Sequence, residues 1–124
     1  MMDQPSIGEL VEAVRSFLET KAMPELKGHT AFHARVAANA LAIVARQLEL
    51  GAKADAEETA RLVSLLGHGG DLDELNRELC RRIRAGGFAL DDPRLTAHLE
   101  ATARDKVAID QPAYSGLRIA RERG

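Results

Sequence analysis

The stretch from Gly28 to Leu50 is the longest unbroken helical pattern in the chain, and it limits the folds that the sequence can adopt. At 100° of rotation per residue, one broad face of this helix is largely apolar. That face carries Phe32, Val36, Ala40, Ile43, Val44, Gln47 and Leu50, with Ala37, Leu41 and Leu48 on its shoulder. The arc is wider than a surface helix needs. We therefore predict a central helix over about 30–50, bracketed by Gly28 and Gly51, which touches neighbours on more than one side.

The residue types available for a core favour a fold made only of helices. Aromatic residues make up 3% of the 124 residues and tryptophan is absent, so Leu, Ile, Val and Ala must fill the interior. These residues suit helix-on-helix packing better than a sandwich or a barrel, which would call for aromatic and β-branched runs. We expect an all-α compact bundle of about five helices with mostly antiparallel neighbours, forming a single domain over 1–124.

Capping residues mark the other helices. Ser6 and Glu9 form a capping box that predicts a helix over about 6–23, which Pro24 should end. The same logic predicts a helix over about 55–66 from Asp55 and Glu58, one over about 71–85 from Asp71 and Glu74, and one from Asp92 and Pro93 to about 109. The buried edge predicted for the 71–85 helix consists of Leu72, Leu75, Leu79 and Ile83.

Two segments are predicted to interrupt or follow this helical pattern. The Gly67–Gly70 sequence GHGG could be mistaken for a phosphate-binding loop, but no strand precedes it, so a helix stop is the better interpretation. In the weakly patterned segment 110–124, Pro112, Tyr114 and Gly116 suggest a turn followed by a short frayed helix, and the segment could be loosely ordered. This tail could fold back on the 30–50 helix or swap into a second copy, which leaves a homodimer open.

Charge and targeting features exclude several classes of function. The net charge is −2, and no helix carries the one-sided Lys and Arg stripe that nucleic-acid binding would use. The groups Arg81, Arg82, Arg84 and Arg118, Arg121, Arg123 are interpreted as solvated helix ends, where cations suit the macrodipole. With one cysteine, no leader pattern and no membrane-length apolar run, the expected location is the cytoplasm, with no membrane or nucleic-acid partner.

The histidines and the cysteine give weak indications of chemistry. His29 and His33 are four residues apart and could converge on a metal, but a tight site needs a third or fourth ligand that the sequence does not offer at a recognised spacing. We therefore predict no metal and no cofactor. We interpret Cys80 as an inert small hydrophobic residue. No local sequence pattern resembles that of a catalytic triad.

Two polar features remain. Arg35, Asn39 and Arg46 line one border of the predicted apolar face, where two guanidinium groups flanking an amide would suit a carboxylate or phosphate. The favoured alternative is that the arginines pair with acids on neighbouring helices. Lys106 lies within the apolar stripe of its helix. We expect its ammonium group to extend to solvent and pair with Asp110 rather than to act as a nucleophile.

Four strings point to a family. They are AFHARVAANALAIVARQLELG, the opening pattern P-x-x-x-E-L-V-E-A-V-R-x-F-L, DLDELNRELCRRIRAG and KVAIDQPAYS. Together they resemble an uncharacterised family of small helical bacterial domains of unknown function. Members are often encoded beside, or fused to, phosphotransferases similar to aminoglycoside kinases, and acyl-CoA dehydrogenases. The resemblance carries no established catalytic residues, but it draws attention to a candidate ligand-binding set of His33, Arg35, Asn39, Lys106 and Tyr114.

Two hypotheses follow. The first, which we favour, is a non-catalytic helical accessory domain that docks onto a phosphotransferase-like kinase or an acyl-CoA dehydrogenase. The second is a small-anion or acyl-ligand binding protein, or a minor enzyme, that uses Arg35, Asn39 and Lys106.

Overall fold

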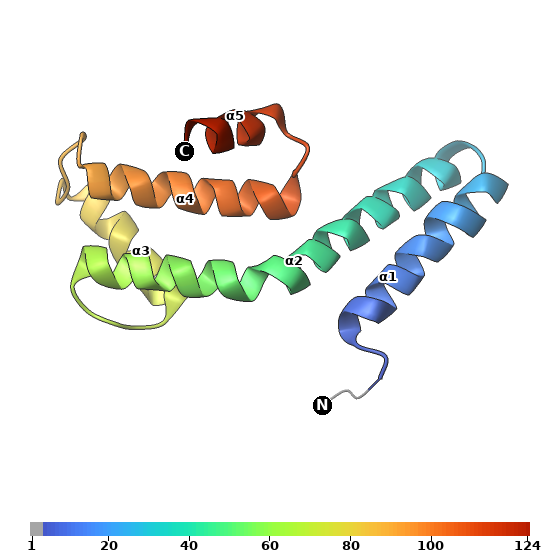
Figure 1. The fold of residues 1–124 in the computed structure, drawn as a ribbon, viewed down its shortest axis with the longest axis horizontal. Coiled ribbons are helices and arrows are strands. Elements are labelled where there is room, and N and C mark those ends of the chain that lie inside the picture. Colours follow the sequence, from blue (N-terminus) through green and yellow to red (C-terminus); the bar gives the residue numbers. More distant parts are fainter. Residues whose placement is uncertain (1–3) are drawn as a thin grey trace. The chain divides into compact units, whose positions relative to one another are not determined.

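The structure is a computed structural model that describes residues 4–124. Its helices are α1 (Ile7–Phe17), α2 (Gly28–Leu66), α3 (Leu72–Arg84), α4 (Pro93–Asp110) and α5 (Ser115–Arg123), and the described residues include no strand (Figure 1). The predicted all-α class with five helices is confirmed. None of the helices over residues 4–124 combines the length and apolar character required to cross a bilayer.

The chain forms two compact units, one ending at Gly51 and the other beginning at Ala52. Helix α2 contributes residues to both. The prediction of a single domain over 1–124 remains a prediction.

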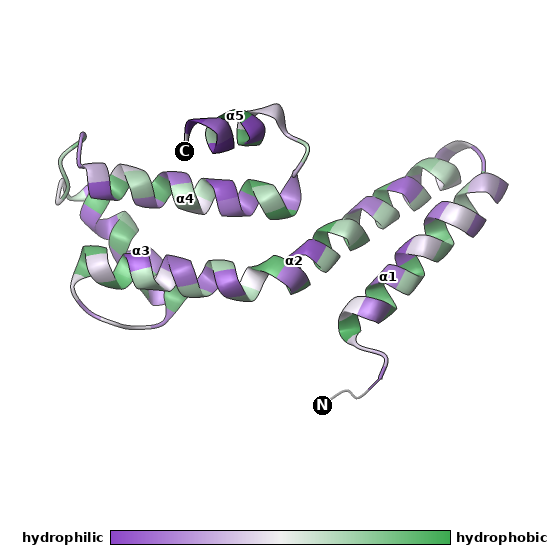
Figure 2. Cartoon of the chain, in the orientation of Figure 1, coloured by the Kyte–Doolittle hydropathy of each residue, from purple (hydrophilic) through white to green (hydrophobic). Residues whose placement is uncertain are grey.

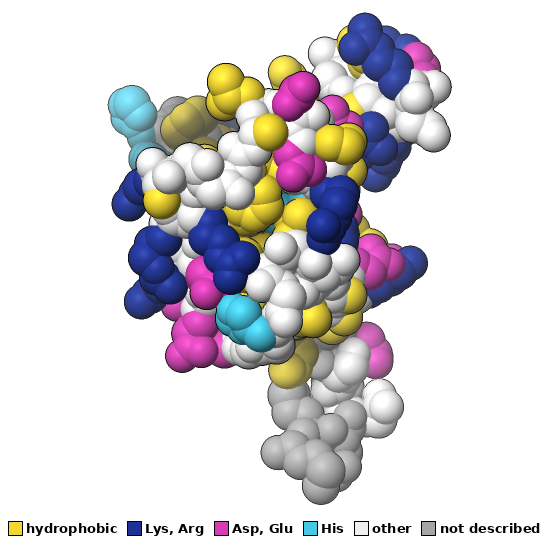
Figure 3. Space-filling view, turned by 90° about the vertical axis from the view of Figure 1, so that its left-hand side faces the viewer, with side chains coloured by type: hydrophobic (Ala, Val, Ile, Leu, Met, Phe, Trp, Pro, Cys, Tyr) yellow, Lys and Arg dark blue, Asp and Glu magenta, His cyan; other side chains and the backbone are white. Residues whose placement is uncertain are grey.

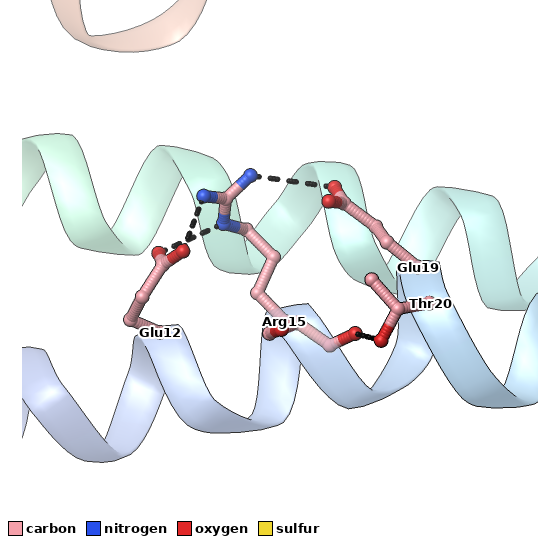
Figure 4. Close-up of polar contacts among 5 residues, drawn as sticks. Glu12, Arg15, Glu19 and Thr20 are labelled. Atoms are coloured by element: carbon pink, nitrogen blue, oxygen red, sulfur yellow. Dashed lines mark hydrogen bonds and ion pairs between the residues drawn. The ribbon is translucent and has the colours of Figure 1, made fainter.

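Helix α1 begins as the sequence predicts and ends in an irregular turn. The Ser6 hydroxyl accepts a hydrogen bond from the Glu9 amide at 3.2 Å, and the Glu9 carboxylate accepts one from the Ser6 amide at 3.4 Å, so the capping box is confirmed. Regular α-helix stops at Phe17, earlier than predicted, and a π-helical turn follows over Leu18–Ala22. The Thr20 hydroxyl donates to the Ser16 carbonyl at 2.7 Å, where it competes with the usual backbone bond (Figure 4).

Proline 24 lies in a 3-10 turn over Met23–Glu25, where its missing amide donor is tolerated. The chain then reverses direction, and α1 runs beside the first part of α2 in the unit that ends at Gly51 (Figures 1 and 4). This pair of helices is called the hairpin below.

The predicted break at Gly51 is wrong, because α2 continues through it to Leu66. The separate helix predicted over 55–66, with Asp55 as its cap, is therefore part of α2. Glycine costs roughly 1 kcal/mol within a helix relative to alanine, which the alanines at 52, 54 and 56 can offset. Gly51 is buried, and a Cβ there would collide with the side chain of Gln47.

The face of α2 predicted to be covered is largely exposed in the hairpin. Ala38, only 2% exposed, is the one fully buried hydrophobic residue described in this unit. It lies on an edge of small and medium-sized side chains that are at least half-buried: Ala31, Ala34, Ala38, Leu41 and Ala45. Because alanines let helices approach closely, this edge rather than the larger face packs in the hairpin. Phe32, Val36, Val44 and Leu50 are 39–58% exposed.

The second unit holds the hydrophobic core. Leu62 and Leu66 of α2 pack with Leu75 and Leu79 of α3, and none of the four is more than 6% exposed. Val63, Leu72, Phe88 and Leu95 surround this cluster.

Two of the predicted helix-end signals in this unit are confirmed, but the side chain of Asp71 makes no capping hydrogen bond at the start of α3. Gly67, at φ +84°, ends α2, which confirms the GHGG segment as a helix stop. Asp92 caps α4 by accepting from the amides of Arg94 and Leu95. The 110–124 tail forms the predicted turn and then a short helix, α5, whose Leu117 is 3% exposed.

One residue of this unit that was predicted to be buried is exposed. Ile83 is 41% exposed, so its place on the buried edge of α3 was wrong. Its neighbour Arg82 instead turns toward α2, where it donates to the Leu66 carbonyl at 3.2 Å.

Candidate docking surface and polar sites

An apolar stripe on α1 faces solvent. Ile7, Leu10, Val14 and Phe17 recur at helical spacing on one side of the helix and are 52%, 43%, 51% and 58% exposed. We call these four residues the α1 apolar stripe. Val11 and Leu18, on the adjoining edge, are half-buried. The hairpin therefore covers one edge of the apolar side of α1 and leaves the other uncovered. Figure 2 shows hydrophobic bands recurring along α1 and the first part of α2.

The opposite side of α1 carries charges that satisfy one another. Arg15 bonds Glu12 through two nitrogens at 2.6 and 3.0 Å and reaches Glu19 at 3.3 Å (Figure 4). The hydrogen bond with Glu12, aided by its charge, raises the pKa of Arg15. Because these groups pair along α1 itself, they make no demand on another element, and α1 is left with one polar and one apolar side.

The predicted ligand-binding set is divided between the two units. His33, Arg35 and Asn39 are exposed residues of the hairpin, and Lys106 and Tyr114 are exposed residues of the second unit. The set therefore stays a prediction. The His33 ring lies edge-on to Phe32 at 5.5 Å between centroids. His29 is also exposed, and residues 4–124 contain no group of three or more His, Cys, Asp or Glu side chains placed to hold a metal ion.

The second unit contains a polar network that sequence reasoning missed. His98 of α4 is 2% exposed, and its Nδ1 accepts a hydrogen bond from Arg61 Nε of α2 at 3.2 Å. The same guanidinium donates to Thr102 Oγ1 at 3.2 Å. Burial, followed by the charge of Arg61, lowers the pKa of His98. The available signal was the spacing of Leu95, His98 and Thr102, which places the histidine on the same side of α4 as a core leucine.

A second histidine ties the loop after α2 to α3. His68 Nε2 lies 2.6 Å from Glu78 Oε2, and Nδ1 lies 2.9 Å from the Gly69 carbonyl oxygen. Both ring nitrogens therefore face acceptors, which favours the doubly protonated ring. The Gly69 carbonyl, followed by Glu78, raises the pKa of His68.

Two shallow hollows border α3. One, of about 390 Å³, is lined by residues of the GHGG segment, by the acids Glu74 and Glu78, and by Leu75, Arg77 and Arg81. The other, of about 400 Å³, is lined by Asn76, Arg77, Cys80, Arg81 and Arg84 and has no acidic residue in its lining. Figure 3 shows Lys and Arg side chains at several places on the face that it presents, with Asp and Glu side chains beside some of them.

These features define a small all-α protein with a leucine core in one unit and an uncovered apolar helix side in the other. Residues 24–114 match the DUF6285 family, described as a domain of unknown function, and the chain belongs to this family. The match includes α2, α3 and α4 and leaves α1 outside it. No curated protein and no solved structure matches the chain.

Proposed function

We propose that this protein is a non-catalytic helical interaction domain that docks onto a partner protein through the α1 apolar stripe. The observation that carries the proposal is the exposure of Ile7, Leu10, Val14 and Phe17, each 43–58% open to solvent along one side of a regular helix. Contiguous apolar surface of this kind on soluble proteins marks interaction sites.

The geometry indicates how a partner would bind. Residues one and two turns apart on a straight helix offer a row of anchors to a groove or to a second amphipathic helix. The charges on the other side of α1 are already paired within the helix, so binding on the apolar side would not require them to lose water. The partners implied by the family resemblance are a phosphotransferase-like kinase or an acyl-CoA dehydrogenase.

The experiment is co-purification of the full chain with each candidate enzyme, followed by size exclusion at micromolar concentration. Leu10→Glu and Val14→Glu place a carboxylate in the stripe and should abolish association. Ser16→Glu adds the same charge on the polar side of α1, where Ser16 is exposed, and should leave association intact. Failure of the unmodified chain to associate with either enzyme, or equal loss in all three variants, contradicts the proposal.

A second candidate function is the binding of a small anion by Arg35 and Asn39 of the hairpin. It is supported by the side chain of Arg35, which is exposed and makes no hydrogen bond or ion pair with any residue from 4 to 124. Thermal shift against CoA esters, nucleotides and carboxylates tests it. Stabilisation that disappears in Arg35→Ala supports this function, whereas no stabilisation, or equal stabilisation in that variant, removes it.

A further inference from the structure

Helix α3 presents three arginines on one side. Arg77, Arg81 and Arg84 follow one another at four- and three-residue spacing, which places them on neighbouring turns of the same face. Arg77 pairs with Asp73 at 2.9 Å. The side chains of Arg81 and Arg84 are exposed and make no hydrogen bond or ion pair with other residues in the described part of the chain.

Most other arginines that the structure describes have partners. Arg15 lies between two glutamates, Arg61 donates to His98 and Thr102, and Arg94 donates to the Ser64 carbonyl at 2.6 Å. Even Arg82, between the two unpaired residues, bonds Glu78 and the Leu66 carbonyl. Like charges three or four residues apart on a helix repel each other. Arg81 and Arg84 therefore form a pair of like charges without a side-chain ion pair, and a bound anion would reduce their repulsion.

These arginines border a hollow. The space of about 400 Å³ beside α3 is lined by Arg77, Arg81 and Arg84 together with Asn76 and Cys80. A volume of this order accommodates a small ligand. The lining contains no carboxylate, so Arg81 and Arg84 have no counter-charge within the hollow, whereas Arg77 pairs with Asp73 outside it.

We infer that this hollow binds the phosphate group of a small phosphorylated molecule, held by Arg81 and Arg84. A guanidinium group presents two parallel N–H donors that match two oxygens of a phosphate, and two such groups one turn apart can share one dianion. The Asn76 side-chain nitrogen donates a hydrogen bond to the Glu58 carboxylate at 3.1 Å. This bond directs the Glu58 carboxylate toward the Asn76 amide. The site is separate from the α1 apolar stripe and does not depend on the docking proposal.

Cys80 provides a reporter inside the hollow, because it is exposed and is the only cysteine of the chain. Iodoacetate and iodoacetamide alkylate a thiol by the same displacement of iodide but differ in charge. The ratio of their rates at Cys80 therefore measures the local positive potential. In Arg81→Gln/Arg84→Gln we expect this ratio to fall about fivefold. Pyrophosphate at constant ionic strength should slow the iodoacetate reaction of the unmodified protein by a similar factor and should have no effect on the double variant.

The matched control is Arg121→Gln/Arg123→Gln, which removes the same charge from exposed arginines of α5. Circular dichroism confirms that each variant is folded. The control should retain both the rate ratio and the protection by pyrophosphate. Absence of protection in the unmodified protein, or equal loss in both double variants, would overturn the inference, because the effect would then be general screening.

Discussion

Arg61 and His98 are 37 residues apart in the chain and meet through a hydrogen bond of 3.2 Å from the arginine Nε to the imidazole Nδ1. Because Nδ1 accepts this bond, the ring is neutral and carries its proton on Nε2. A cation is thus held against a nearly fully buried histidine, an arrangement that tolerates only one protonation state of the ring.

The first prediction is that acid destabilises the second unit through His98. Its pKa is lower in the folded chain than the ordinary value of about 6.5, so the unfolded chain binds more protons below that pH. The contribution of His98 to stability is therefore present above about pH 6.5 and is lost as the pH falls toward the lowered folded pKa. Chemical denaturation at pH 7.5 and 5.0 should show that the unfolding free energy falls more between these two pH values in the unmodified protein than in the His98→Asn variant. In the unmodified protein the charge of Glu58 opposes this lowering of the His98 pKa.

His68 should show the opposite dependence. Its pKa is raised in the folded chain, so its contribution is complete below about pH 6.5 and is lost as the pH rises through the raised value. In His68→Gln the stability gained on moving from pH 8 to pH 6 should shrink. Amide hydrogen exchange over Gly67–Gly70, compared at the two pH values after correction for intrinsic rates, gives a local reading. Unchanged pH dependence in the variant would contradict the ion pair with Glu78.

Substitutions of a buried leucine and of an exposed leucine should differ in their cost to stability. Leu62 is fully buried and Leu99 is 48% exposed. Truncation of Leu62 to alanine should cost about 2–5 kcal/mol of unfolding free energy, because it leaves a cavity, whereas Leu99→Ala should cost less than about 1 kcal/mol. Equal costs from urea denaturation would show that the core lies elsewhere.

The helix caps offer another matched pair. Asp92 accepts from two backbone amides at the start of α4, whereas the side chain of Asp71 makes no such bond at the start of α3. Asp92→Ala should therefore lower the unfolding free energy by about 1 kcal/mol. Asp71→Ala should lower it by less, and the reverse order would contradict the assigned caps.

Local signals in the sequence predicted most of the helices. Ser6, Glu9, Asp92 and Pro93 act through neighbours within four residues, so their effects can be read from the chain. The predicted helix end at Gly51 was wrong because a helix can continue through glycine when the residues on both sides favour helix. The burial of Ala38 in place of Phe32 depends on which edge of α2 meets another helix, which periodicity within one helix does not decide.

The polar features were harder to predict. The contact between Arg61 and His98 joins two helices, and no spacing within either helix encodes it. Arg81 and Arg84 were recognised as a basic group and assigned to a helix end, but the hollow beside them arises from packing. The candidate set of His33, Arg35, Asn39, Lys106 and Tyr114 came from the family resemblance and remains a prediction.

The most direct test of the docking proposal is the reactivity of a thiol placed in the stripe. In a Cys80→Ser background, Val14→Cys and Leu62→Cys report on positions that are 51% and 0% exposed. We expect the thiol at 14 to react with N-ethylmaleimide at nearly the rate of a free thiol and to become protected when the partner enzyme is added, while the thiol at 62 stays protected throughout. A thiol at 14 that is as unreactive as the one at 62 in the isolated protein would contradict the docking proposal.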